Sequence, residues 1–193
     1  MAVSKEEILD GVTALHVPMY SLTNGLLAYT ATRLISEAHM RNILVSIDAS
    51  SVSVLENFGV TKSLALIDRL TPSVLLCNDD EARVLGLNSL PNGVDTLVVK
   101  RGSRPVQVFD SSGTREFEVA PVDHVVDTTG AGDAFAAGFL TAARGAFLAG
   151  AGGSHGIIGC AARRLAVDAC AGGVGMGRRR RLLAAGAGSG AAG

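Results

Sequence analysis

The stretch SVLLCNDDEARVLG, residues 73–86, contains a complete transition from strand to helix. Residues 73–77 form a short continuous apolar run, which is typical of a strand buried on both faces of a parallel sheet. Asn78 offers a side-chain oxygen that can cap the first turn of a helix, and Gly86 can adopt the left-handed conformation that ends one. We therefore predict a strand over residues 73–77 and a short helix that ends near Leu85.

Similar apolar runs lie on both sides of this stretch. Strands that alternate with helices indicate an α/β fold with a mostly parallel sheet covered on both faces, and the last two strands are close enough to form a hairpin. The further predicted strands are residues 14–19, 43–47, 96–100, 106–109 and 114–119, and the further predicted helices are residues 26–40, 61–70 and a helix that starts at 130–133 and continues through 134–143.

Composition and charge exclude several classes of function. The chain has 193 residues, a formal net charge of −1 and a pI near 6.4, so it has no overall attraction to nucleic acid or to an acidic membrane. Cys77, Cys160 and Cys170 are far apart and lack a Cys-x-x-Cys motif or a His partner, which argues against a disulfide framework and a zinc site. Because no signal peptide and no membrane-spanning apolar run are found, we expect a cytoplasmic protein without a membrane partner.

A second stretch, DTTGAGDAF at residues 127–135, brings small residues and a carboxylate to the start of a helix. The backbone amides of Gly130, Ala131 and Gly132 are left uncovered and can point at an anion, which the helix dipole also favours. Asp133 would repel a phosphate there unless it had a separate task, such as accepting the proton of a hydroxyl that attacks the phosphate. The stretch therefore predicts a phosphoryl-transfer site, with close helix packing as the alternative role of its small residues.

Two common phosphate-binding motifs are excluded. A P-loop needs a lysine directly after a glycine, and none of Lys5, Lys62 and Lys100 satisfies this. A dinucleotide-binding fingerprint needs Gly or Ala at its sixth position, where this chain has Phe135, and no acidic residue follows at the required distance.

The sequence resembles the PfkB family of carbohydrate kinases, which includes ribokinase, fructokinase, 2-keto-3-deoxygluconate kinase and adenosine kinase. Residues 127–139 follow the family pattern D-T-x-G-A-G-D-x-F-x-x-G, residues 78–81 supply its N-x-x-E motif, and VVKRGSRPV at 98–106 supplies its glycine-containing turn. These motifs occur in the expected order over residues 14–143. The resemblance implies a ribokinase-like three-layer α/β/α fold with a mostly parallel sheet.

The resemblance also implies a role for the residues of the phosphate-binding turn. Asp133 would be the catalytic base, and the amides from Gly130 through Ala131 to Gly132 would form the anion hole for the transferred phosphoryl group of ATP.

The other two motifs would bind the nucleotide and its metal ion. Asn78 and Glu81 would organise Mg²⁺ through water near the ATP phosphates, and a capping box is the alternative role of this pair. Lys100 and Gly102 would lie at the phosphates, with Lys100 or Arg101 balancing their charge, unless both cations are ordinary strand-end charges.

Two groups of residues complete this assignment. Asp127 and Thr129 match positions that bind a monovalent cation such as K⁺ in several relatives. The four histidines show no ligand spacing and are assigned no role; they are His16, His39, His124 and His155.

The chain departs from the family at both ends. Relatives are longer, so the first strands of the sheet and the small β lid over the sugar are expected to be missing here. After the signature helix the match is loose, which leaves the adenine pocket unassigned. We expect a partial kinase domain over residues 1–172 and a low-complexity, disordered tail over residues 173–193.

Two functional hypotheses follow. The first is ATP-dependent phosphorylation of a hydroxymethyl group of a small sugar or sugar acid. The second is a catalytically incompetent kinase fragment that keeps only a nucleotide-binding, phosphate-binding or interaction role. Nucleic-acid binding through Arg178–Arg181 is disfavoured because aromatic platforms and a basic fold surface are lacking, and a homodimer is left open.

Overall fold

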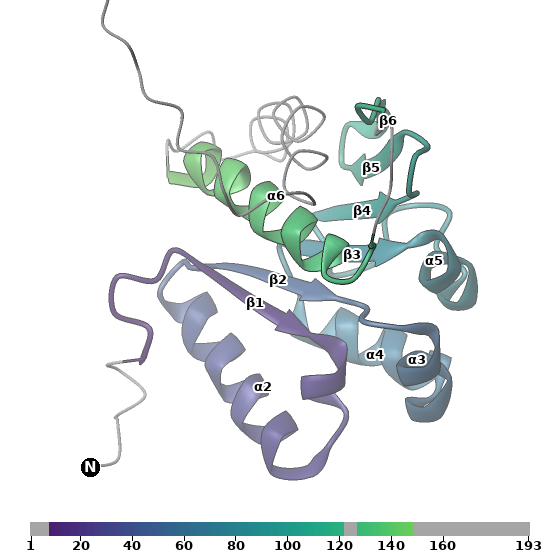
Figure 1. Ribbon diagram of the computed structural model, residues 1–193. Helices are drawn as coiled ribbons and strands as arrows, with labels where there is room; N and C mark the ends of the chain where they lie inside the picture. The colour runs from purple at the N-terminus through teal and green to yellow at the C-terminus, as the bar shows by residue number, and fades with distance from the viewer. Residues whose placement is uncertain (1–7, 122–126, 149–193) are drawn as a thin grey trace, which may run out of the picture.

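Six strands form one sheet in which their spatial order repeats their order along the chain. This computed structural model describes residues 8–121 and 127–148. Strands β1 to β4 are parallel, and β5 and β6 add an antiparallel hairpin at one edge (Figure 1). The strands are β1 (Ala14–Pro18), β2 (Leu44–Asp48), β3 (Val74–Asn78), β4 (Thr96–Lys100), β5 (Val106–Asp110) and β6 (Gly113–Phe117).

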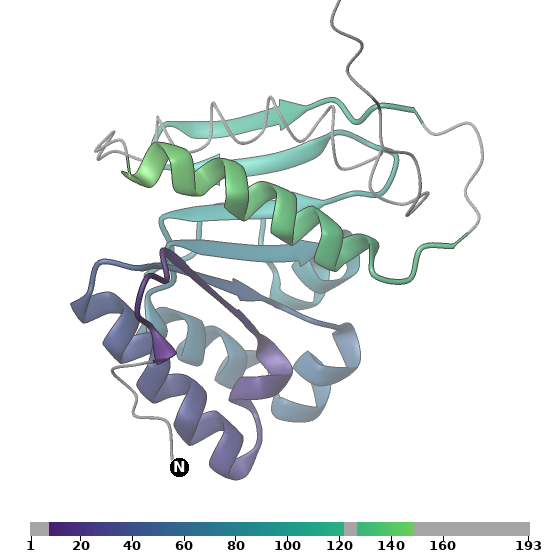
Figure 2. The same cartoon turned by 60° about the vertical axis from the view of Figure 1, so that its left-hand side comes forward.

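Helices cover both faces of this sheet (Figure 2). Four of them pack on one face: α2 (Gly25–Met40), α3 (Val52–Phe58), α4 (Val60–Leu70) and α5 (Asp79–Leu85). Helix α6 (Ala131–Leu148) packs on the opposite face, and a short 3₁₀ helix, η1 (Met19–Leu22), follows β1. The predicted three-layer α/β/α fold with a mostly parallel sheet is confirmed. The described part of the chain has no strand beyond these six and therefore no β lid.

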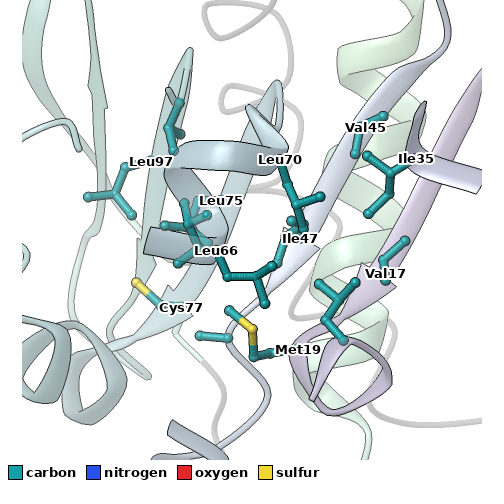
Figure 3. Packing of buried hydrophobic residues seen from close by; sticks show 14 of the residues in the cluster. Val17, Met19, Ile35, Val45, Ile47, Leu66, Leu70, Leu75, Cys77 and Leu97 are labelled. Atoms are coloured by element: carbon teal, nitrogen blue, oxygen red, sulfur yellow. The ribbon is translucent and has the colours of Figure 1, made fainter. Parts of the chain in front are cut away.

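Both faces of the central strands are buried, which explains their continuous apolar sequences. On the face of α2, α4 and α5, Ile47, Leu75 and Leu97 are fully buried together with Cys77 (Figure 3). The burial of Cys77 raises the pKa of its thiol to about 12. On the other face, alternate strand residues pack against Phe139 of α6, which is 1% exposed.

Most predicted elements agree with the structure to within two residues, but the sequence did not predict α3 or η1. Serines at 50, 51 and 53 indicated a polar connection after β2. Ser51 instead caps a helix, because its Oγ accepts a hydrogen bond from the Val54 amide at 3.3 Å and Leu55 is then buried. The strand predicted to reach Met19 ends at Pro18, and η1 begins at Met19. Helix α6 continues to Leu148 rather than to residue 143.

Some expectations cannot be compared with the structure. The expected disorder of residues 173–193 and the C-terminal part of the expected domain at residues 1–172 lie outside the described residues. Within residues 8–121 and 127–148, no helix combines the length and apolar character needed to cross a bilayer.

Packing of Phe139 should hold α6 on the sheet. We expect Phe139→Ala to lower the free energy of unfolding by about 3–5 kcal/mol, because it leaves a cavity between α6 and the sheet. Urea unfolding monitored by circular dichroism measures this loss. Thr141→Ala on the exposed side of the same helix is the control and should change stability by less than about 0.5 kcal/mol. Equal effects of the two substitutions would contradict this packing.

Candidate active site

The carboxyl ends of the parallel strands meet the first turn of α6 on one face of the sheet. Parallel pairing brings Asn78 of β3 opposite Lys100 of β4 and Pro18 of β1 opposite Asp48 of β2. Because Asp48 also lies opposite Leu76, the ends of β3 and β4 extend two residues beyond this level. The first turn of α6 lies close to Lys100: a Cβ atom built on Gly132 would be 3.6 Å from Lys100 Nζ. The fold therefore places an ammonium group beside the predicted phosphate-binding turn.

Hydrogen bonds within residues 127–134 shape this turn. The Asp127 carboxylate accepts a hydrogen bond from the Thr129 amide at 2.8 Å, and Gly130 has a φ of 76°, a conformation that favours glycine. The Ala131 amide donates to the Thr128 carbonyl at 3.1 Å, and the Ala134 amide starts the helical pattern by donating to the Gly130 carbonyl at 2.9 Å. These contacts turn the chain into α6 at Gly130.

Two amides in the first turn of α6 remain available to a ligand. The amides of Gly132 and Asp133 find no acceptor among the described residues, as is usual for the first turn of a helix. The anion hole was predicted at residues 130–132. Of these, Gly132 is one of the two available donors, Ala131 already has a partner, and the amide of Asp133 was not predicted. The available donors of the turn are therefore the amides of residues 132 and 133, which lie beside Lys100.

The Asp133 side chain is exposed at this same turn. A carboxylate there can be approached by a hydroxyl from solvent, which a general base requires. Asp127 and Thr129 are also exposed, and the carboxylate of Asp127 is partly engaged by the Thr129 amide. The cation-binding role suggested for these two residues remains a prediction.

Lys100 forms an ion pair that the sequence did not reveal. Its Nζ donates to Asp48 Oδ2 at 2.7 Å, and the two side chains are only 17% and 15% exposed. Asp48 Oδ1 accepts a hydrogen bond from the Ser50 amide at 2.8 Å, so both carboxylate oxygens have partners. The signal in the sequence was a carboxylate at the end of an apolar strand, which could have marked Asp48 as a site residue.

Arg101 and Gly102 lie in the loop after β4. Arg101 donates to Glu116 Oε1 at 2.9 Å and lies 3.7 Å from Asp79 Oδ1, while Arg104 also pairs with Asp79. These contacts engage Arg101 with the hairpin and with the start of α5. Lys100, rather than Arg101, is therefore the cation beside the turn of α6. Gly102 has a φ of 63° and open space around the position of a Cβ atom.

Asn78 and Glu81 form a complete capping box at the start of α5. Asn78 Oδ1 accepts from the Glu81 amide at 2.9 Å, and the Glu81 carboxylate accepts from the Asn78 amide and from Asn78 Nδ2, both at 2.8 Å. Burial raises the pKa of Glu81, which is 2% exposed, and the hydrogen bond from the Asn78 amide opposes this shift. The capping alternative is thus present in the structure, and the metal-binding role of the pair remains a prediction.

Direct metal coordination finds little support here. The described residues contain no group of three or more His, Cys, Asp or Glu side chains that could hold a metal ion together. A cation near Asn78 and Glu81 would therefore need most of its ligands from water or from a bound phosphate, which is common for Mg²⁺.

His16 lies near this group although its spacing in the sequence indicated no role. Its Nδ1 is 3.2 Å from Ser46 Oγ on the neighbouring strand. The pKa of His16 is lowered, mainly by burial. The carboxylates of Asp48 and Asp133 oppose this shift, whereas the charge of Lys100 adds to it. The imidazole thus experiences the charges of both the ion pair and the predicted base.

The capping box predicts a graded effect on stability. Asn78→Ala removes the acceptor for the Glu81 amide and one donor to the buried Glu81 carboxylate, so we expect a loss of about 1–2 kcal/mol in the free energy of unfolding. Asn78→Ser keeps a capping oxygen and should lose less. Urea unfolding of both variants checks this order, and equal losses would argue against capping by Asn78.

His16 predicts a dependence of stability on pH. Since its pKa in the folded state lies below the ordinary value of 6.5, the unfolded chain takes up the proton first as the pH falls through this window. The contribution of His16 to the free energy of unfolding should therefore be complete above pH 6.5. On acidification this contribution should decrease by at most about 1.4 kcal/mol per pH unit. We expect His16→Gln to reduce this slope in urea unfolding measured between pH 5 and 7.5. An unchanged slope would exclude His16 as its source.

Comparison with known proteins identifies a sequence family over part of the chain. Residues 67–150 match the pfkB family carbohydrate kinases. The cytidine kinase of Thermococcus kodakarensis is 48% identical over 50 residues, which are 25% of this chain and 18% of that protein. The adenosine kinase of Saccharomyces cerevisiae is 47% identical over 47 residues, which are 23% of this chain and 14% of that protein. The aligned parts are thus small fractions of these relatives.

The fold comparison covers more of the chain. The crystal structure of a fructokinase double mutant from Vibrio cholerae, with fructose, ADP and potassium ion bound, superposes with a TM-score of 0.64 at 21% identity. The match covers 85% of this chain and 55% of the fructokinase chain. The described part of this chain therefore has the fold of these proteins, and it spans little more than half of that structure.

Proposed function

We propose, on the premise that residues 67–150 belong to the pfkB family of carbohydrate kinases, that this chain carries the phosphoryl-transfer site of an ATP-dependent kinase for a small hydroxyl-bearing substrate. The observation that supports this most directly is the position of Lys100 beside the first turn of α6, where the amides of Gly132 and Asp133 have no acceptor within the described part of the chain. An ammonium group, two amide donors and a carboxylate then converge at the end of one sheet. Phosphoryl transfer needs these groups more than it needs covalent chemistry from the protein.

The turn of α6 would stabilise the transferred phosphoryl group. Backbone amides fixed by the helix need no reorganisation when negative charge moves during the reaction. Gly130 lets the chain enter the helix, and Gly132 leaves the approach to the amides free of side-chain atoms. Lys100, at the end of β4, would balance the charge of the phosphate. Gly102 would let the loop after β4 approach the nucleotide.

Asp133 would act as the general base. A substrate hydroxyl that lies between this carboxylate and the phosphate bound at the turn would lose its proton to Asp133 as its oxygen attacks phosphorus. The leaving group is ADP, and the products are the phosphorylated substrate and a proton held by the carboxyl group. The exposure of Asp133 leaves room for such a hydroxyl.

The donor set fits Mg²⁺ held through water rather than in a protein cage. Asn78 and Glu81 would orient waters of the ion, since the oxygens of Glu81 retain acceptor capacity after capping. When bound, the ion would supply charge neutralisation at the phosphates. Asp127 and Thr129 are the candidates for K⁺, an ion that is present in the fructokinase structure.

The substrate would be a small sugar, a sugar acid or a nucleoside that offers a hydroxymethyl group. The family match and the fructokinase structure support a sugar, whereas the cytidine and adenosine kinases extend the class to nucleosides. In each of these classes the proposed acceptor would be a primary hydroxyl, which suits a single carboxylate base.

A second candidate function is nucleotide or phosphate binding without turnover. The chain spans only 55% of the fructokinase chain, and the described residues contain no β lid that could close over a sugar. A phosphate site without a substrate site would bind ATP but have no acceptor to phosphorylate.

Titration calorimetry and a transfer assay together separate these candidates. The 193-residue chain would be titrated with ATP and Mg²⁺ and then incubated with labelled ATP and a panel of sugars, sugar acids and nucleosides. Binding with transfer supports the kinase, whereas binding without transfer to any acceptor supports the second candidate. A folded chain that does not bind ATP would refute both.

For an active chain, Asp133→Asn tests the base. We expect it to lower kcat by about 10²- to 10⁴-fold while ATP affinity is kept, because the amide cannot accept the proton. Glu56→Gln, an equally conservative change on the exposed surface of α3, is the matched control and should leave kcat unchanged. A kcat of Asp133→Asn close to that of the wild type would rule out this role.

A further inference from the structure

We propose that this chain has a second activity, the hydrolysis of ATP, in which water replaces the hydroxyl-bearing substrate as acceptor of the phosphoryl group. The inference rests on the proposed function, because it uses the same turn at the start of α6 and the same base. It follows from the exposure of this turn and from the contacts within the protein that hold it.

Water can reach the whole turn at the start of α6. Residues 127–134, which include Asp133, are all exposed. The six strands of the described ranges all belong to one sheet, so none of them covers this turn. Enzymes that transfer reactive groups close their sites against water, which prevents loss of the group by hydrolysis. The part of the chain that the structure describes offers no such barrier at Asp133.

Asp133 is the carboxylate at this turn that can accept a proton from water. Within residues 8–121 and 127–148, its side chain has no hydrogen bond and no ion pair. The neighbouring carboxylates have other partners. Asp48 belongs to a buried ion pair, Glu81 is buried in the capping box, and Asp127 accepts from an amide of its own turn. A water molecule at Asp133 would therefore meet an exposed carboxylate that is free to act as a base.

The groups that would stabilise the transition state are held by the protein itself. The Ala134 amide donates to the Gly130 carbonyl at 2.9 Å, which fixes the helical start from which the amides of residues 132 and 133 project. Lys100 is kept beside this start by its buried ion pair. Donors that are already fixed stabilise developing charge without reorganisation. A substrate hydroxyl is therefore not needed to assemble them.

The hydrolysis step needs no reactant beyond ATP and water. The water oxygen forms a bond to the γ-phosphorus, and the bond from this phosphorus to the oxygen that bridges to the β-phosphate breaks. One proton of the water passes to the Asp133 carboxylate, and the electron pair of the broken bond leaves with ADP. The products are ADP and inorganic phosphate, and Asp133 then returns its proton to the solvent.

Release of inorganic phosphate in the absence of any acceptor measures this activity. The full chain would be incubated with ATP and Mg²⁺ in a buffer free of sugars, nucleosides and polyols. We expect Asp133→Asn, purified in the same way, to lower the rate of release by about 10²- to 10⁴-fold, because the amide cannot accept the proton. Glu56→Gln on the exposed surface of α3 is the matched control and should leave the rate unchanged.

Two further measurements keep this test independent of misfolding and of contaminating enzymes. Titration calorimetry and thermal unfolding would establish that Asp133→Asn is folded and still binds ATP. Hydrolysis in water enriched in a heavy oxygen isotope should place the isotope in the released phosphate and not in ADP, because the water attacks the γ-phosphorus.

Three results would overturn the inference. The first is ATP binding by the wild-type chain without release of phosphate. The second is equal release by the wild-type chain and Asp133→Asn, which would show that the hydrolysis does not use this base. The third is incorporation of the heavy isotope into ADP. All three leave the proposed kinase intact, since transfer to a hydroxyl is measured separately. A folded chain that does not bind ATP would refute the proposed function and this inference together.

Discussion

Parallel pairing of β3 and β4 in register is the constraint on which the rest of the site depends. It brings Asn78 opposite Lys100, so that the capping box of α5 and the ammonium group leave the sheet at the same level. Pairing of β2 with β3 then places Asp48 opposite Leu76. Asp48 is two strands away from Lys100, with β3 between them, and is within reach of the long lysine side chain. A slip of one residue in either pair would turn these side chains toward the opposite face of the sheet.

Hydrophobic packing supplies the remaining part of the geometry. Lys100 and Asp48 belong to the face of the sheet that α6 covers, and the same face carries Leu44, Val74, Leu76 and Val98. Because Phe139 lies on these apolar residues, the amino end of α6 is brought over the polar strand ends rather than over the core. The apolar contacts in the middle of the helix thus position the polar groups at its start, although they lie two turns away.

The sequence was sufficient to predict the fold because each central strand is a continuous apolar run between recognisable ends. Asn78 and Gly86 marked the limits of α5, and the small residues at 130–132 marked the start of α6. The serine-rich start of α3 could not be distinguished from a loop, since a serine that caps a helix and a serine in a turn look alike in sequence. The Asp48–Lys100 pair joins residues 52 positions apart, and no local pattern reports such a contact. Similarly, Arg101 and Lys100 are neighbours in sequence, and only the strand geometry sends their side chains to different partners.

The ion pairs of the loop after β4 have a mechanical consequence. Arg101 and Arg104 connect this loop to Asp79 in the first turn of α5, and Arg101 also connects it to Glu116 of the hairpin. The loop after β4 and the first turn of α5, which follow neighbouring strands, are therefore held together by ion pairs as well as by their connections to the sheet. They should move as one stiff unit, so that any fluctuation at this edge of the sheet displaces both segments together. Because most of these charges are partly exposed, added salt should screen the ion pairs and make the connection between the two segments less stiff.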